Sequence, residues 1–184
     1  MTLTPTPGQT VGPFFGYALP FPHDNELVPP GSPNAVRLHG RVLDGHGEPV
    51  PDAILELWQA DADGTVVQEQ GSLRRDPATF TGFGRASTDD DGHYSFTTLT
   101  PGAPFFAVTV FARGVLNRLF TRAYLPGATD AFLDGLDPDR RSTLLTTTDD
   151  TGSMETGPMT GYRFDVHLQG ERETVFLSYP RHEA

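Results

Sequence analysis

The sequence predicts an all-β fold, an antiparallel β-sandwich with an extended N-terminal arm and one short helix. Three observations support this prediction. The 184 residues include 20 glycines and 17 prolines, which is too many for a helical bundle. Between them, β-branched and aromatic residues recur with a period of two rather than 3.6. Asp-Gly pairs, which favour tight hairpins, separate several of these runs.

The first part of the chain, residues 1–34, differs from the rest. It is rich in proline and aromatic residues, as in Pro13-Phe14-Phe15 and Pro20-Phe21-Pro22, and it shows few alternating positions. A segment this apolar is poorly suited to exposure to water, so we expect an arm that packs on its own chain and on a partner chain. Residues 35–184 are expected to form a single sandwich domain.

Alternating apolar patterns define the expected strands. These are Val36–Leu43, Ala53–Trp58, His93–Thr98, Phe105–Ala112, Leu119–Leu125, Tyr162–Leu168 and Glu173–Tyr179. Hairpin turns with a positive φ are expected at Asp44-Gly45, Asp63-Gly64 and Asp91-Gly92. Asp137 and Pro138 predict the start of a short amphipathic helix that continues through Arg140–Leu145.

The composition excludes several classes of function. The chain has 13 basic and 24 acidic side chains, a net charge of −11, which argues against nucleic acid as a partner. It has no cysteine, and all 13 basic residues are arginines, so thiol nucleophiles, Schiff-base lysines and phosphate-loop lysines are excluded. No apolar run is long enough to span a membrane, and the N-terminus lacks a signal-peptide pattern, so a cytoplasmic protein is expected.

Most polar motifs have an ordinary structural interpretation. Asp89-Asp90-Asp91-Gly92 lacks the pattern of a calcium loop and indicates a hairpin turn. Glu56 is weak evidence for acid–base chemistry, and Trp58 is expected in the core rather than as a sugar-stacking platform. The histidines have no metal-site spacing and are expected on the surface or in turns: His23, His39, His46, His93, His167 and His182.

Arg113 stands at the end of a predicted strand, next to Gly114, where loops gather. Such a guanidinium is suited to binding a carboxylate. From the composition alone, a surface arginine paired with one of the many acidic side chains is the simpler interpretation.

Motifs along nearly the whole chain resemble those of the intradiol ring-cleaving dioxygenases. The resemblance begins with Thr6–Phe14 (TPGQTVGPF) and continues with Glu56–Asp61 (ELWQAD). It is strongest at Tyr162–Gly170 (YRFDVHLQG) and Glu173–Phe176 (ETVF). The resemblance implies the sandwich fold of that family.

Members of this family hold a non-haem Fe(III) with two tyrosines and two histidines. At the matching positions this sequence has Val66 for the first tyrosine, and Phe105 and Ala107 for the His-x-His pair. No tyrosine occurs between Pro101 and Phe106, where the second would stand. These side chains have no lone pair for a metal, so the resemblance implies no metal site and no catalytic residue in this chain.

Two-chain members of the family have an iron-bearing β subunit and an iron-free α subunit of the same fold. The resemblance implies that this chain is such an α subunit, with Fe(III) held by its β partner. The complex would use O2 to cleave 3,4-dihydroxybenzoate to 3-carboxy-cis,cis-muconate, in the β-ketoadipate pathway. In this interpretation Arg113 faces the substrate, and the arm residues that line the substrate cavity are Thr10, Gly12, Pro13 and Phe14.

Two alternatives remain open at this stage. One is a transthyretin-like β-sandwich that acts as a binding module without enzymatic activity. The other is a self-sufficient dioxygenase with rearranged iron ligands, drawn from Tyr94, Tyr124, Tyr162 and His93.

Overall fold

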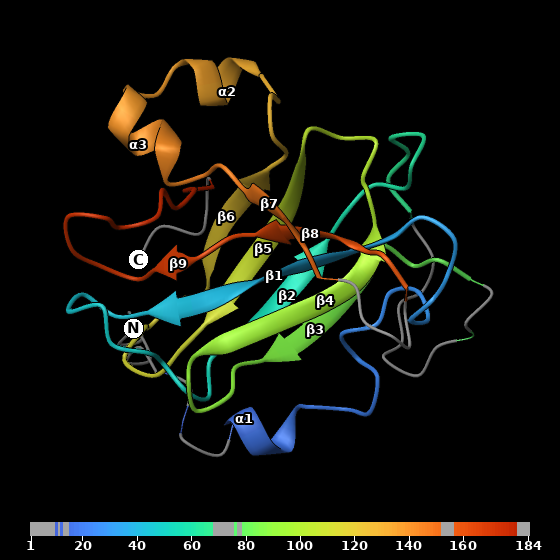
Figure 1. The fold of residues 1–184 in the computed structure, drawn as a ribbon. Helices are drawn as coiled ribbons and strands as arrows, with labels where there is room; N and C mark the ends of the chain where they lie inside the picture. The colour runs from blue at the N-terminus through green and yellow to red at the C-terminus, as the bar shows by residue number, and fades with distance from the viewer. Residues whose placement is uncertain are drawn as a thin grey trace, which may run out of the picture.

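Two β-sheets lie face to face in the computed structural model, which describes residues 10, 12, 15–67, 76, 79–151 and 157–179 (Figure 1). The first sheet has the strand order β4-β1-β8-β7, with β9 also paired to β1, and the second has the order β3-β2-β5-β6. The strands are β1 (Ala35–Leu43), β2 (Ile54–Trp58), β3 (Phe83–Ser87), β4 (His93–Leu99), β5 (Phe105–Phe111), β6 (Leu119–Tyr124), β7 (Thr147–Asp150), β8 (Thr160–Arg163) and β9 (Val166–His167). The predicted all-β sandwich is confirmed.

Three short helices accompany the sheets. They are α1 (Phe15–Ala18), α2 (Ala131–Asp134) and α3 (Pro138–Ser142). Figure 1 shows α2 and α3 together on one side of the molecule and α1 on the opposite side. The predicted helix start is confirmed, since Pro138 is the first helical residue and Asp137 its N-cap, but the helix ends at Ser142. The Thr143 hydroxyl then donates to the carbonyl of Arg140.

The core lies between the sheets and follows the period of two. On β1, Val36, Leu38 and Val42 are buried together, as the sequence predicts. Leu55 and Leu57 of β2 face them from the second sheet as part of the same buried cluster. A smaller cluster lies under α2 and α3 and consists of Tyr124, Leu133, Leu144 and Val175.

The chain between residues 24 and 28 joins the two sheets along one side. The amide of Arg85 on β3 donates to the carbonyl of Asp24 at 2.9 Å, and the amide of Thr97 on β4 donates to that of Asn25 at 3.0 Å. Leu27 donates its amide to Thr97 and places its side chain in the main core. This segment therefore pairs with the outer strand of each sheet and covers two otherwise open edges.

The predicted strand Tyr162–Leu168 is interrupted. It forms β8 and β9, both parallel to β1, with a break at Phe164 and Asp165. At the break the Asp165 carboxylate, rather than a backbone carbonyl, accepts the amide hydrogen of Arg41, at 3.0 Å. Gly40 is essential to this arrangement, because a Cβ there would collide with the carbonyl of Phe164. The predicted continuous strand is therefore wrong at Asp165, where the side chain takes the place of a backbone acceptor between the strands.

Other differences arise where apolar alternation is absent or misleading. The segment Glu173–Tyr179 was expected to be a strand but makes only an isolated bridge, between Leu177 and Phe120 of β6. The polar, fully exposed β7 and the short β3 were not predicted, nor were α1 and α2.

The turn predictions hold in part. Gly64 and Gly92 have positive φ values of 83° and 71°. In the first turn the positive φ belongs to Gly47, at 81°, and not to Gly45. Asp44 instead accepts amide hydrogens from His46 and Glu48, which fixes the turn through its side chain. Asp89 does the same for Asp91 and His93, so the acidic run is a hairpin turn, as expected.

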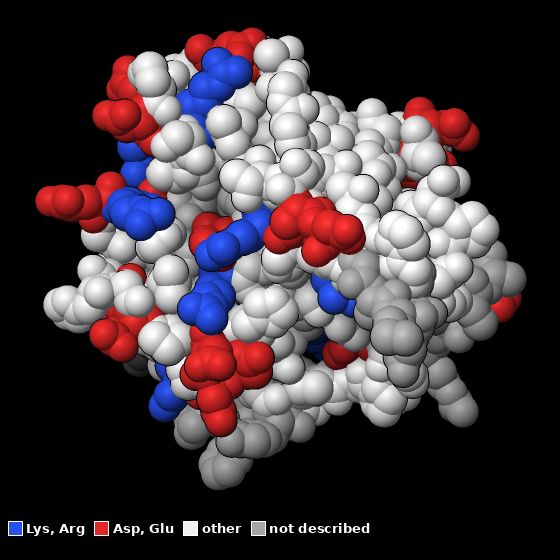
Figure 2. Space-filling view, viewed as in Figure 1, with Lys and Arg blue, Asp and Glu red and all other residues white. Residues whose placement is uncertain are grey.

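In the described ranges, no helix has both the length and the apolar character that crossing a bilayer requires. Figure 2 shows acidic and basic side chains interspersed over the part of the surface that carries β1 and β9. This face therefore lacks the continuous basic surface that a polyanion would need.

Candidate functional site

Arg113 and Thr10, two of the predicted substrate-binding residues, lie together just beyond the end of β5. The Thr10 hydroxyl accepts the amide hydrogen of Gly114 at 2.8 Å, which ties the arm to the loop that carries Arg113. Gly12 is exposed, and no described residue occupies the space where its side chain would stand. Pro13 and Phe14 lie outside the described residues.

Asp52 holds the Arg113 side chain in place. Its Oδ2 lies 2.8 Å from Nε of Arg113, and the arginine side chain is 54% exposed. The other guanidinium nitrogens bond to no described residue. Asp52 itself has an unusual φ of 68° and packs closely against Gly16 of α1. The ion pair therefore presents a fixed cation beside the arm.

The three remaining positions singled out in the sequence offer no ligand to a metal. Phe105 and Ala107 lie on the outer face of β5, and Val66 is an exposed residue bridged to Ala60. Their side chains have no donor atoms. Among the described residues, no group of three or more histidine, aspartate or glutamate side chains is placed to hold a metal ion. The residues present do not fit the family's ferric ion.

Phe105 and Ala107 border a hollow on the outer face of the second sheet. Ala107 pairs with Trp58 of β2 on one side and Arg122 of β6 on the other, so its small side chain leaves a depression between two large ones. The cavity measures about 540 Å³. Its lining consists of Trp58, Phe105, Ala107, Val108, Thr109, Phe120, Thr121, Arg122 and Tyr179.

Arg122 belongs to a half-buried polar cluster at the edge of this hollow. Its Nη1 donates to the Tyr124 hydroxyl at 3.1 Å and lies 3.3 Å from Asp130, and its guanidinium stacks 4.2 Å from the ring centre of Phe105. Burial raises the pKa of Tyr124, whose hydroxyl donates to Asp130 at 2.8 Å. Burial opposes ionisation of Asp130, but the Leu133 amide, the Tyr124 hydroxyl and Arg122 together lower its pKa. The cluster therefore holds a charged, oriented arginine.

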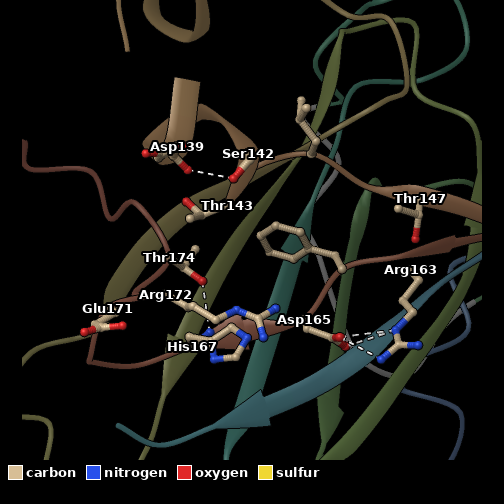
Figure 3. Close-up of a pocket in the computed structure, with 12 residues that line it drawn as sticks. Asp139, Ser142, Thr143, Thr147, Arg163, Asp165, His167, Glu171, Arg172 and Thr174 are labelled. Atoms are coloured by element: carbon tan, nitrogen blue, oxygen red, sulfur yellow. Dashed lines mark hydrogen bonds and ion pairs between the residues drawn. The ribbon is translucent and has the colours of Figure 1, made fainter. Parts of the chain in front are cut away.

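A second cavity, of about 370 Å³, lies between α3, β9 and the loop at residues 171–174 (Figure 3). Arg163 and Asp165 pair with each other there at 2.8 Å. Figure 3 also shows Arg172 beside His167. Burial, followed by the charge of Arg172, lowers the pKa of His167. This cavity mixes both signs of charge and contains none of the predicted site residues.

The proposed alternative iron ligands do not meet. Tyr94 is buried and donates its hydroxyl to the carbonyl of Phe164 at 2.6 Å, while Tyr124 bonds to Asp130 near the second sheet. Tyr162 packs on Phe106 instead. His93 belongs to β4 in the first sheet. The structure gives these residues no common ligand geometry.

One structural interpretation from the sequence is wrong. Trp58 is not in the core but 50% exposed, stacked on Phe83 with ring centres 4.4 Å apart. Glu56, two residues earlier on the same face and paired with Arg85, was the signal that this face points outward. His39 lies on the outward side of β1, as expected, but its side chain is only 14% exposed because it contacts Asp149 at 3.1 Å.

Sequence reasoning also missed Asp52 and the cluster around Arg122. The alternation of Phe120, Arg122 and Tyr124 places them on one strand face, which is a usable signal. No sequence pattern brings Tyr179 to that face, since it comes from a distant segment. Asp130 follows Tyr124 closely in the chain, but no periodic pattern predicts the turn that brings it back. Asp52 likewise meets Arg113 only through the fold.

Comparisons with known proteins identify relatives of this chain. A protein-family model described as Dioxygenase matches residues 11–109. The protocatechuate 3,4-dioxygenase alpha chains of Burkholderia cepacia and Pseudomonas putida are 37% and 36% identical to this chain, and each match covers 96% of this chain and 98% of the relative. The beta chain of the Burkholderia cepacia enzyme is 35% identical over 84% of this chain and 74% of its own length.

Solved structures of similar shape include the dioxygenase domain of a carbohydrate-binding fusion protein from Streptomyces sp. SirexAA-E. It is 27% identical, with a TM-score of 0.57, and the match covers 91% of this chain and 99% of that domain. Catechol 1,2-dioxygenase from Pseudomonas arvilla C-1 has a TM-score of 0.56 at 21% identity, over 86% of this chain and 58% of that one, which indicates a shared fold.

Proposed function

The chain belongs to the intradiol ring-cleaving dioxygenase family, and we propose that it is the α subunit of a protocatechuate 3,4-dioxygenase. Full-length similarity to two alpha chains is the observation that carries this proposal. A binding module without enzymatic activity is not favoured by these relatives. A self-sufficient enzyme is not favoured by the separation of Tyr94, Tyr124 and Tyr162.

The partner is a β subunit of the same fold, which holds the iron. This is supported by the similarity to a beta chain and by the donor-free side chains of Val66, Phe105 and Ala107. The iron supplies the ring-cleavage chemistry with O2. The complex converts 3,4-dihydroxybenzoate and one O2 to 3-carboxy-cis,cis-muconate, a reaction that adds both oxygen atoms to the product.

This chain contributes substrate placement. The arm, residues 1–34, packs on its own sandwich and on the β subunit, with Thr10, Gly12, Pro13 and Phe14 against the partner's substrate cavity. Arg113, fixed by Asp52, binds the substrate carboxylate through its remaining guanidinium nitrogens. A fixed cation also offsets the repulsion between an anionic substrate and a chain of net charge −11.

Co-expression with the β chain of the same genome tests the proposal. The purified complex should contain iron and consume O2 with 3,4-dihydroxybenzoate, whereas this chain alone should do neither. Arg113→Ala should raise KM about 10- to 150-fold with iron content unchanged, because a charged hydrogen bond to the substrate is lost.

Arg141→Ala is the matched control. Arg141 is a partly exposed arginine of α3 that pairs with Asp134 of α2. It should leave KM unchanged. An Arg113→Ala complex with the KM of the unmodified enzyme would reject the substrate role of Arg113. Failure of the two chains to form an active complex would reject the subunit assignment itself.

A further inference from the structure

Asp52, the partner of Arg113, stands at a position that suits an aspartate poorly. It follows Pro51 in a turn and has a φ of 68°. A turn in which proline precedes a residue of positive φ favours glycine at the second place, because a Cβ is strained there. In addition, Oδ1 of Asp52 is buried and accepts no hydrogen bond from a described residue. A buried carboxylate oxygen without a donor destabilises the folded chain.

The ion pair with Arg113 does little to offset these two effects. The Arg113 side chain is 54% exposed, and an ion pair with such a side chain contributes little to stability. Strained backbone and unsatisfied buried polar groups occur mainly where a residue serves function rather than the fold. The reason for an aspartate at this position is therefore to be sought in its effect on Arg113.

Asp52 and the arm hold Arg113 from two sides. Asp52 packs against Gly16 of α1 so closely that a Cβ on the glycine would stand 3.1 Å from Cβ of Asp52. Thr10 bonds to the amide of Gly114, the residue after Arg113. Nε of Arg113 lies 2.8 Å from Oδ2 of Asp52, which leaves the two Nη groups as a planar pair of donors. The direction of this pair therefore depends on Asp52.

We propose that Asp52 is a positioning residue, which directs the Nη groups of Arg113 toward the carboxylate of the substrate although it lowers the stability of the chain. This inference rests on the proposed function, since it takes Arg113 as the group that binds the substrate. In this role Asp52 acts only through Arg113. Loss of its charge should therefore weaken substrate binding and leave the chemical step unchanged.

Asp52→Asn in the co-expressed complex removes the charge and keeps a residue type that tolerates a positive φ. We expect KM for 3,4-dihydroxybenzoate to rise about 10-fold with kcat and iron content unchanged, because the guanidinium is no longer held in one direction. In an Arg113→Ala complex the same substitution should change KM by less than about 2-fold, because the group through which Asp52 acts is already absent.

Asp52→Gly tests the effect on stability in the full-length chain without a partner, by urea unfolding followed by circular dichroism. Glycine relieves the positive φ and removes the buried oxygen, so the urea midpoint should equal or exceed that of the unmodified chain. Asn34→Gly is the matched control, because exposed Asn34 also has a positive φ, of 61°, and stands just before β1. It should leave KM unchanged.

Three results would overturn the positioning role and leave the proposed function intact. They are an unchanged KM for Asp52→Asn beside a raised KM for Arg113→Ala, an equal effect of Asp52→Asn with and without Arg113, and a urea midpoint for Asp52→Gly clearly below that of the unmodified chain. An inactive complex of the unmodified chains would instead reject the proposed function, and this inference with it.

Discussion

At the scale of single residues, a buried hydroxyl shows how the first sheet is held at its irregular point. Tyr94 of β4 is 1% exposed and donates its hydroxyl to the carbonyl of Phe164, at the break between β8 and β9, at 2.6 Å. Burial and the nearby Asp165 raise the pKa of Tyr94 well above its ordinary value, so the hydroxyl remains a donor. The carbonyl at this break therefore depends on a side chain for its hydrogen bond.

Tyr94→Phe should destabilise the chain by about 1–3 kcal/mol, because the carbonyl of Phe164 is left buried and unsatisfied. Urea unfolding followed by circular dichroism measures the change. Tyr162→Phe is the control, since the hydroxyl of this half-buried tyrosine has no hydrogen bond with a described residue, and it should cost less than about 0.5 kcal/mol. Equal stability of the two variants would contradict the role assigned to the hydroxyl.

At the scale of elements, the short helix α2 depends on its cap. Asp130 accepts the amide hydrogen of Leu133 at 2.7 Å and also the Tyr124 hydroxyl, so one carboxylate begins the helix and joins it to β6. Leu133 is fully buried and anchors the helix in the smaller core cluster. An element of four residues has little stability of its own and requires such contacts.

Asp130→Ala should cost about 1–3 kcal/mol, because the cap and the partner of Tyr124 are both lost. Asp130→Asn keeps one oxygen to accept the Leu133 amide, but it loses the charge and the second acceptor oxygen, which the Tyr124 hydroxyl uses. It should still cost less than Asp130→Ala, because the cap remains. The pKa of Asp130 is lower in the folded state than in the unfolded state, where it is about 4. The charge of Asp130 therefore contributes its full stability above the unfolded-state pKa. This contribution is lost as the pH falls through the folded-state pKa.

Urea unfolding at pH 7, 5, 4 and 3 distinguishes these contributions. The stability of the unmodified chain relative to Asp130→Asn should be constant from pH 7 to 5 and then decrease toward pH 3. A difference that stays constant down to pH 3 would show that the carboxylate charge contributes nothing to stability.

Elements with regular alternation were predictable from the sequence, and those fixed by distant side chains were not. β1 and β4 lie within one residue of their expected limits, because each has buried residues at every second position. The break at Asp165 depends on the distant amide of Arg41, and α2 depends on Tyr124 as well as on its own cap. Neither contact has a local signature.

At the scale of the whole molecule, the same reasoning applies to the candidate sites. Arg113 could be singled out from the sequence by its place at a strand end, and the structure joins it to Thr10 through the loop backbone at Gly114. Its partner Asp52 comes from a different turn of the sandwich. The hollow over Ala107 likewise combines three strands and the C-terminal segment, so its existence follows from strand pairing that no single segment encodes.

The segment from Asp24 to Val28 contacts both sheets, so we expect it to contribute to their unfolding as one unit. Leu27 is 3% exposed, and its side chain lies so close to Gly84 of β3 that a Cβ there would collide with it, while its backbone bonds to Thr97 of β4. Leu27→Ala should cost about 2–5 kcal/mol, as expected when a large core side chain is removed. Because both sheets share this residue, the transition should stay two-state, with a lower midpoint and an unchanged slope in urea.

Trp58 fluorescence reports on the second sheet and circular dichroism on the whole chain, so the two transitions of Leu27→Ala should coincide. Leu116→Ala, at a side chain that is 60% exposed, is the control and should change stability by less than about 0.5 kcal/mol. If the segment were only loosely docked on a finished sandwich, Leu27→Ala would behave like this control. If instead the segment joined two sheets that unfold independently, the fluorescence and circular dichroism transitions would occur at different urea concentrations. Because this segment pairs with both β3 and β4, we expect the two transitions of Leu27→Ala to coincide at a clearly lower urea concentration than in the unmodified chain.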